Sequence, residues 1–280
     1  MTTPSPPLVS IIVPTRNSAG ALPACLASVS RQTYPAIELI VVDNESADDT
    51  LEIARAATPL VFTHGPERCA QRNAGVRAST GSYIVFIDSD MVLAPTVIER
   101  CVRVMTDEPA VRGVIIPELS LGEGFWALCK ALERSCYVGD DTIEAARFFA
   151  RDAFEAVGGY DEALTAAEDW DLSQRVSALG PLRRIDAYIT HLEGALTLRK
   201  TMRTKFYYGT TLGRYIRKQP ARSARQFQLI RPAFLRHWRR LLAQPTLTAG
   251  MIVMKGCEFA AGAAGIVCAS WQGTRKSNST

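Results

Sequence analysis

Tyr83-Ile-Val-Phe-Ile-Asp88 is the stretch that decides the fold, because it is a continuous apolar run that ends in a carboxylate. Val9-Ser-Ile-Ile-Val-Pro-Thr15 and Glu38-Leu-Ile-Val-Val-Asp43 have the same form, and Leu60-Val-Phe-Thr is a shorter example. Runs rich in β-branched residues and bounded by turn residues predict buried strands.

Helical segments separate these runs. Residues 19–33 place Leu22, Leu26 and Val29 on one stripe, and further helices are predicted from Thr50 onward and over residues 69–78. Apolar strands that alternate with helices indicate a mainly parallel sheet covered on both faces. The predicted fold class is therefore α/β, with a Rossmann-like sheet flanked by helices.

In such sheets, ligands bind beyond the carboxyl ends of the strands. The polar residues at three of these ends are Thr15 to Asn17, Asp43 with Asn44, and Asp88 with Asp90. Together they define one candidate site.

The Asp88-Ser89-Asp90 turn is the candidate metal site. Two carboxylates on either side of one small residue can approach one divalent cation, and Mg²⁺ and Mn²⁺ prefer oxygen ligands. The alternative is a turn in which aspartates cap the next helix. The position directly after a buried strand favours the metal.

Several motifs in order resemble the family 2 inverting glycosyltransferases of the GT-A fold. The match runs over roughly residues 9–193 and consists of Val9–Asn17, Leu39–Thr50, Arg72–Gly75, Phe86–Asp90, Gly158–Glu162 and Glu168–Leu172. The resemblance implies a donor such as a UDP- or GDP-sugar and a Mg²⁺ or Mn²⁺ cofactor.

The resemblance also implies which residues hold the donor. Asp43 would bind the base or ribose, and Asp88 and Asp90 would hold the metal that bridges the diphosphate. The rest of the nucleotide-sugar site would be Pro14, Thr15, Arg16, Asn17, Arg72, Asp88 and Ser89. Two alternatives stay open: Asp43 beginning an Asx turn, and Arg72 forming a surface ion pair.

The acceptor side follows from the same resemblance. Asp169 corresponds to the acid that would deprotonate the acceptor hydroxyl, and Glu168 beside it would orient a loop or the acceptor. These acids could also simply favour the N-terminal end of a helix over Ala166–Val176. The acceptor residues would be Gly159, Tyr160 and Trp170, although a core role for Trp170 is equally open.

Two further side chains belong to this half of the chain. His191, at the end of a predicted last strand, is either a metal ligand or a structural histidine. Asp171 and Arg175 are four residues apart and are predicted to form a structural ion pair.

The carboxyl-terminal third is strongly basic. Residues 194–280 contain 16 Lys/Arg and one acid, Glu258, whereas residues 1–193 contain 16 Lys/Arg and 27 Asp/Glu. Between Arg199 and Arg240, thirteen of these cations alternate with aromatic residues and no acid occurs. This mixture is typical of an anionic membrane surface. A nucleic-acid partner is not expected, since no recognition motif is present.

Thr246–Trp271 is mostly apolar but contains Lys255 and Glu258, which can pair at i,i+3. A charge at the centre of a spanning helix is costly. A helix that packs on the protein or lies in the interface is therefore predicted in preference to one that spans.

The predicted organisation is a catalytic domain over residues 1–195 and a basic helical region over 196–280. The seven scattered cysteines and the lack of a signal sequence at Met1–Leu8 favour the cytoplasm, on the inner face of the cell membrane. The predicted function is metal-dependent, inverting sugar transfer to a hydroxyl, on a lipid-linked or polysaccharide acceptor. The alternatives are a nucleotidyltransferase, a retaining glycosyltransferase and a non-catalytic module that binds membranes or polyanions.

Overall fold

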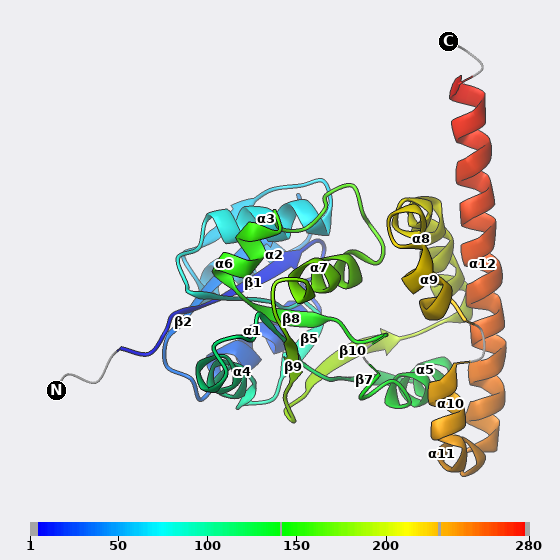
Figure 1. The fold of residues 1–280 in the computed structure, drawn as a ribbon, viewed down its shortest axis with the longest axis horizontal. Coiled ribbons are helices and arrows are strands. Elements are labelled where there is room, and N and C mark those ends of the chain that lie inside the picture. The colour runs from blue at the N-terminus through cyan, green and yellow to red at the C-terminus, as the bar shows by residue number, and fades with distance from the viewer. Residues whose placement is uncertain (1–4, 141, 229–230, 278–280) are drawn as a thin grey trace. The chain divides into compact units, whose positions relative to one another are not determined.

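The computed structural model describes residues 5–140, 142–228 and 231–277, and it contains two compact units (Figure 1). The first unit consists of Met1–Glu118, Glu144–Glu162 and Glu168–Leu192. The second consists of Leu119–Ile143, Ala163–Ala167 and Glu193–Thr280. The chain passes from the first unit to the second for the last time at residues 192–193, close to the boundary predicted after residue 195. The second unit also includes two earlier segments of the chain.

A seven-stranded sheet forms the centre of the first unit. Its order is β3 (Val61–Thr63), β2 (Ile37–Asp43), β1 (Val9–Thr15), β4 (Tyr83–Phe86), β8 (Ala146–Ala150), β6 (Gly113–Ile115) and β9 (Leu182–Arg184). The first four strands are parallel, β8 runs antiparallel to both neighbours, and β6 and β9 are parallel. The predicted strands are confirmed to within two residues at each end.

Helices cover this sheet, as predicted, and α1 and α3 lie on opposite sides of it (Figure 1). The crossover from β1 to β2 and the crossover from β3 to β4 run in opposite directions along the sheet. Because both are right-handed, their helices α1 and α3 are expected on opposite faces. The helices of this unit are α1 (Leu22–Ser30), α2 (Thr50–Ala57), α3 (Arg68–Arg77), α4 (Val97–Asp107), α6 (Arg151–Ala156) and α7 (Glu168–Ser177). The mainly parallel α/β fold is thus confirmed.

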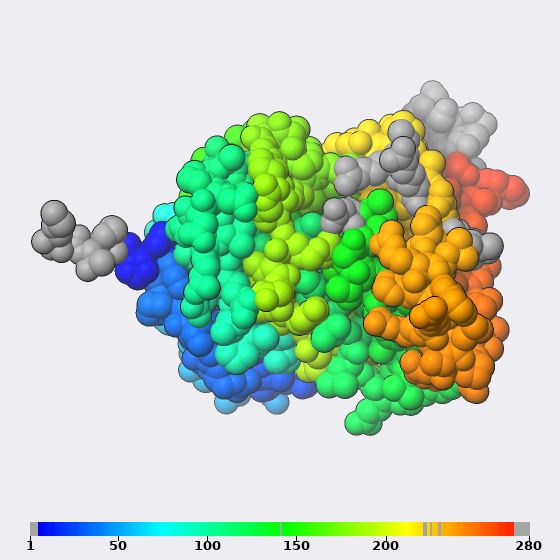
Figure 2. Space-filling model, turned by 60° about the horizontal axis from the view of Figure 1, so that its bottom comes forward, coloured from blue at the N-terminus to red at the C-terminus, as the bar shows by residue number. Residues whose placement is uncertain are grey.

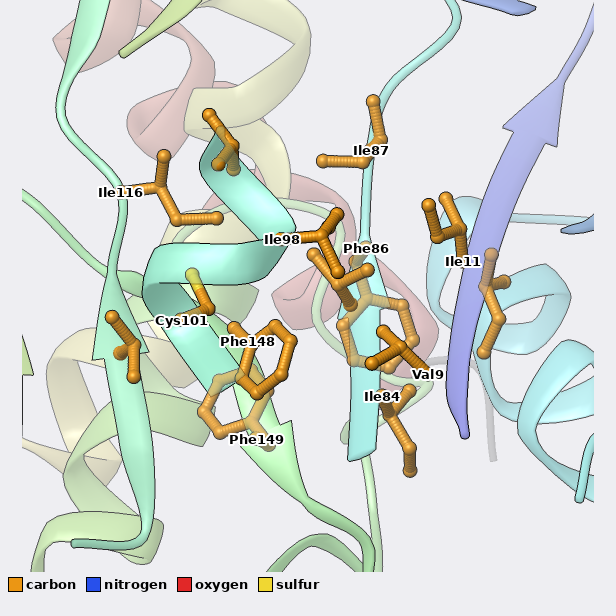
Figure 3. Close-up of a cluster of buried hydrophobic side chains, with 14 of the residues drawn as sticks. Val9, Ile11, Ile84, Phe86, Ile87, Ile98, Cys101, Ile116, Phe148 and Phe149 are labelled. Carbon is orange, nitrogen blue, oxygen red and sulfur yellow. The ribbon is translucent and has the colours of Figure 1, made fainter. Parts of the chain in front are cut away.

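The core of the first unit lies against β1, β4 and β8. Every residue of β1 is buried, and the side chains of Ile11, Phe86 and Phe148 belong to one apolar cluster (Figure 3). Pro14 is tolerated in this central strand because the β1–β4 register ends at Ile12. Its missing N–H therefore costs no ladder bond.

A second sheet has the order β5 (Met91–Leu93), β10 (Ile189–Ala195) and β7 (Glu118–Glu123). β5 and β10 are antiparallel, and His191 is paired with Met91. The pairing brings the predicted last strand beside the residues that follow Asp90.

The second unit is helical. It contains α5 (Phe125–Ser135), α8 (Leu198–Lys218), α9 (Pro220–Gln226), α10 (Pro232–Arg236), α11 (Trp238–Leu242) and α12 (Pro245–Ser277). Helix α5 belongs here because it packs on α12, where a Cβ on Gly250 would lie 2.4 Å from the Phe125 ring and 2.6 Å from the Cys129 Sγ. The predicted Lys255–Glu258 pair is confirmed, at 3.2 Å.

Candidate active site

The loop after β2 is built around Asp43, which is fully buried. Its Oδ1 accepts hydrogen bonds from Thr15 Oγ1 at 2.9 Å and Ser46 Oγ at 2.5 Å, and its Oδ2 accepts one from the Ser46 amide at 2.8 Å. The Asp43 carboxylate thus binds the amide three residues further on, one residue beyond the bond of an Asx turn. Asp43 joins the ends of β1 and β2 and shapes the loop that lies beside them.

The turn after β1 completes this edge. Pro14 and Thr15 are buried in the strand, whereas Arg16 and Asn17 are exposed. Asn17 has a φ of 48° and accepts a bond from the Ala47 amide at 2.8 Å, which ties the two strand-end loops together. One residue further, Ser18 accepts a hydrogen bond from Ser89 at 2.9 Å, so the Asp88–Asp90 turn joins the same edge.

Arg72 is the centre of the site. Its guanidinium is completely buried, although it comes from α3, which has a largely polar sequence. One terminal nitrogen donates to Asp88 Oδ1 at 2.6 Å, and the other donates to Asp169 Oδ1 at 2.9 Å. The surface ion pair considered for Arg72 is wrong, because the planar fork bridges two carboxylates inside the protein. A contact with nucleotide phosphates stays a prediction, and both terminal nitrogens already have carboxylate partners.

The charges around Arg72 set the protonation of the two aspartates. Burial alone would raise the pKa of Asp88, but the nearby Arg72 and Arg147 hold it well below its usual range. Burial likewise opposes ionisation of Asp169, and Arg72 and Arg147 again prevail, so its pKa is lowered. Both side chains remain partly open, at 20% and 24% exposure. The site therefore contains two ionised carboxylates, and both are bonded to the Arg72 guanidinium.

Glu168 differs from its neighbour. It is buried, and burial together with the charge of Asp169 raises its pKa. Arg68, at 2.8 Å, is its ion-pair partner and lies one helical turn before Arg72 on α3. The predicted orienting role suits this position, since Glu168 connects the start of α7 to α3.

Asp90 and His191 form a second, more open group. The Asp90 Oδ2 lies 3.3 Å from His191 Nε2, and their side chains are 41% and 17% exposed. Because β10 is paired with β5, the histidine is placed directly beside the Asp88–Asp90 turn.

This group can be tested as a metal site from its donors. The carboxylate oxygen suits Mn²⁺ or Mg²⁺ when substrate oxygens complete the shell, and the imidazole nitrogen, a ligand of transition metals, favours Mn²⁺ over Mg²⁺. Among the described residues, no group of three or more His, Cys, Asp and Glu side chains is arranged to hold a metal. The donor set thus fits a cation that is shared with a substrate, and Asp88 is instead bonded to arginine.

The predicted acceptor residues occupy different environments. Tyr160 is only 3% exposed, and its hydroxyl donates to Asp169 Oδ1 at 2.9 Å. Its ring also lies 5.0 Å from the Arg72 guanidinium. Gly159 is buried with a φ of 70°, and Trp170 is half-buried. In this conformation, Tyr160 is placed to orient Asp169 and is too buried to receive an acceptor.

Arg147, like Arg68, is a residue of the site that sequence reasoning missed. It lies on β8, and its Nε donates to Glu118 at 2.6 Å while its Nη1 lies 3.5 Å from Asp88 Oδ2. The sequence signal that could have found it is a charged residue inside the apolar run Ala146-Arg-Phe-Phe-Ala. Because burial of an unpaired charge is costly, such a residue predicts a buried acidic partner. The predicted Asp171–Arg175 pair is confirmed, at 2.8 Å.

Comparison with known proteins identifies the family. The model of Glycosyl transferase family 2 matches residues 10–154. A PGL/p-HBAD biosynthesis glycosyltransferase of Mycobacterium tuberculosis is 32% identical over 180 residues, which are 60% of this chain and 69% of the relative. A chondroitin synthase of Escherichia coli is 27% identical over 191 residues, which are 64% of this chain but 28% of that protein.

Solved structures agree on the fold. The mannosyltransferase PcManGT of Pyrobaculum calidifontis, in complex with GDP-Man and Mn²⁺, superimposes with a TM-score of 0.62 at 18% identity, covering 96% of this chain and 88% of its own. TarS of S. aureus in complex with UDP-GlcNAc gives a TM-score of 0.53 at 19% identity, covering 73% and 66%. The chain belongs to glycosyl transferase family 2 and is a glycosyltransferase with the GT-A fold.

Proposed function

We propose that this enzyme transfers one sugar from a UDP- or GDP-type donor to a hydroxyl group, with inversion at the anomeric carbon and with Asp169 as the base. One observation carries the proposal: Arg72 joins Asp169 to Asp88, so the candidate base stands beside the candidate donor site. The relatives that bind UDP-GlcNAc and GDP-Man support a nucleotide-sugar donor.

Inversion requires a base on the face of the sugar opposite the leaving diphosphate. Asp169 is ionised and partly exposed, so it can accept the proton of the attacking hydroxyl as the new bond forms. Arg72 and Tyr160 hold the same oxygen of Asp169, which directs the carboxylate. Glu168 and Arg68 fix the start of α7 on which Asp169 stands.

Asp90 and His191 would hold a divalent cation, with Asp88 close by, and the neighbour in complex with Mn²⁺ supports the presence of such a cation. When bound, the cation stabilises the charge that accumulates on the leaving diphosphate. The exposed Arg16 and Asn17 are proposed to line the nucleotide side, and the fully buried Asp43 would reach the base or ribose only if its bonds to Thr15 and Ser46 opened. The acceptor is proposed to be a lipid-linked sugar or a polysaccharide, used at the cytoplasmic face of the membrane.

The direct test is transfer from a panel of UDP- and GDP-sugars to polyprenyl-linked and oligosaccharide acceptors, with NMR analysis of the anomeric configuration. We expect one donor to be used and its configuration to be inverted. A product that keeps the donor configuration would replace the inverting mechanism with a retaining one. Absence of both transfer and donor hydrolysis across the panel would contradict the proposed enzyme activity.

Replacement of Asp90 tests the metal assignment without relying on turnover. We expect Asp90→Asn to weaken binding of UDP or GDP in the presence of Mn²⁺ by at least about tenfold, because the most exposed carboxylate of the site is lost. Calorimetry with and without Mn²⁺ measures this effect. Asp107→Asn, at an exposed position on α4, is the matched control. Equal Mn²⁺ dependence in the Asp90 variant and the control would remove Asp90 from the metal site.

Removal of the Tyr160 hydroxyl tests the orientation of Asp169. Tyr160→Phe keeps the ring, its edge-on packing against Phe86 at 5.0 Å and its contact with Arg72. We expect kcat to fall about tenfold with the donor Kd unchanged, because a hydrogen bond to a charged group is worth about 1.5–3 kcal/mol.

Tyr34→Phe is the matched control, since it deletes a hydroxyl that donates to the Pro7 carbonyl at 2.6 Å away from the site. Equal kcat values for Tyr160→Phe and the unaltered enzyme would show that Asp169 is oriented without Tyr160.

A further inference from the structure

Helices α5 and α12 of the second unit turn four charged side chains toward each other, and α12 leaves apolar side chains exposed. Lys130 and Glu133 on α5 meet Lys255 and Glu258 on α12 in a buried ring of ion pairs: Lys130–Glu133 is 2.8 Å, Lys130–Glu258 is 2.9 Å and Lys255–Glu133 is 2.7 Å. Tyr137 adds a hydrogen bond to Glu133 at 2.9 Å. Charged side chains that turn inward and pair with one another are typical of helices next to lipid.

The outward face of α12 is correspondingly free of charge. Ile252, Val253, Val267 and Trp271 are 62%, 53%, 55% and 70% exposed. No exposed residue from Ala249 to Trp271 is charged, because Lys255 and Glu258 are both turned toward the ion-pair ring. This charge-free face is about 33 Å long at 1.5 Å per residue.

The length and composition of α12 are a second indication that this helix contacts lipid. Pro245–Trp271 is long and apolar enough to cross a membrane, with a mean hydropathy of 1.5, and 28% of its most apolar window is buried. The helix of a soluble core would be mostly buried, and this one is mostly open.

Glycines make the packing of α12 on α8 unusually close. A Cβ on Gly265 would lie 2.2 Å from the Phe206 carbonyl oxygen, and a Cβ on Gly209 would lie 2.2 Å from that of Gly262. Small residues that let helix backbones touch are characteristic of helix pairs in membranes. The two helices lie side by side along much of their length (Figure 1).

The surroundings of α12 favour an anionic bilayer. Arg199 to Arg240 includes thirteen cations and no acid. On α11, Trp238 is 52% exposed with Arg239 stacked 5.4 Å from its ring centre, and Leu242 is 67% exposed. The segment of α11 and the first part of α12, in orange, forms a continuous part of the surface in Figure 2. Aromatic rings and cations of this kind lie at the headgroup level.

We propose that the outer face of α12, together with Trp238 and Leu242 of α11, inserts into the acyl-chain boundary of a bilayer that contains anionic lipids, while the exposed Arg239 and Arg240 of α11 contact the headgroups. The helix lies in the plane of the membrane, with the protein covering its charged side. The inference rests on the second unit alone and does not depend on the proposed sugar transfer.

The test is binding of the full chain to vesicles of phosphatidylcholine, with and without an equal part of phosphatidylglycerol. We expect binding to the mixed vesicles, and quenching of Trp271 fluorescence by lipids brominated in the acyl chains, measured as the difference from Trp271→Phe. Val253→Asp should lower the partition coefficient at least about tenfold, since burial of a valine contributes about 1.5 kcal/mol or more.

Leu179→Asp is the matched control, because it introduces the same charge at a 48% exposed leucine of the first unit. Urea unfolding of Val253→Asp without vesicles checks that the exposed substitution leaves the fold intact. Equal vesicle binding by Val253→Asp and Leu179→Asp, or no quenching of Trp271, would overturn the insertion. A dimer that Val253→Asp dissociates while vesicle binding is retained would reassign the face to a second copy.

Discussion

Asp169→Asn is expected to reduce turnover by at least about a thousandfold while the donor Kd changes less than about threefold. The amide has nearly the same shape as the carboxylate, and its oxygen can still accept from Arg72 and Tyr160, which both contact Asp169 at 2.9 Å. What it loses is the capacity to take a proton, and general-base catalysis contributes about 10²–10⁴-fold. The measurement combines single-turnover sugar transfer with calorimetric donor binding.

Glu168→Gln provides the comparison on the same helix. Glu168 is buried against Arg68 and has a raised pKa, so its replacement should impair turnover much less than that of Asp169. If the Glu168 variant loses turnover and the Asp169 variant retains it, the base has been assigned to the wrong carboxylate.

Much of the first unit could be predicted because its signals are local. β1, β2 and β4 are continuous apolar runs, and parallel strands necessarily bring their carboxyl ends to one edge of the sheet. The loops that contain Asp43 and Asp88 were therefore placed correctly relative to each other without any tertiary information.

The role of Arg72 could not be predicted from a local sequence pattern. It stands on a helix with a polar sequence, where an arginine usually faces solvent. Its partner Asp169 is 97 residues away, and only the docking of α7 against α3 reveals the pair. Arg147 was missed for a related reason, since β8 joins the sheet antiparallel between β4 and β6 by long-range pairing.

The same limit applies to α12. The spacing of Lys255 and Glu258 predicts their mutual pair, and the two charges are the reason why a spanning helix is disfavoured from the sequence. The sequence does not reveal that Lys130 and Glu133 of α5 complete a ring with them. Once these partners are known, the charges lie on the protein side of the helix and cease to oppose contact with lipid.

Arg72→Met should produce the largest loss of stability, about 3–5 kcal/mol in the free energy of unfolding at pH 7, because breaking a buried ion pair leaves uncompensated charge. Three carboxylates would lose their shared cation: Asp88 at 2.6 Å, Asp169 at 2.9 Å and Glu168 at 3.6 Å. Arg100→Met is the control, since its partner Asp186 is 78% exposed and surface pairs contribute about 0–1 kcal/mol. Urea unfolding measures both variants.

The pH dependence of this loss follows from the lowered pKa values of Asp88 and Asp169. Lowered values in the folded state add stability above the ordinary carboxyl pKa of 3.8, and that contribution disappears as the pH falls through the folded values. Without Arg72 the two pKa values are held down only by the more distant Arg147 and Arg68 and therefore rise, so protonation near pH 4 relieves the variant before it affects the unaltered protein. The deficit of Arg72→Met should therefore be full at pH 7 and smaller at pH 4. A deficit that is equal at both pH values would mean that Arg72 stabilises the fold through its packing and its contact with Tyr160, with little contribution from the carboxylates.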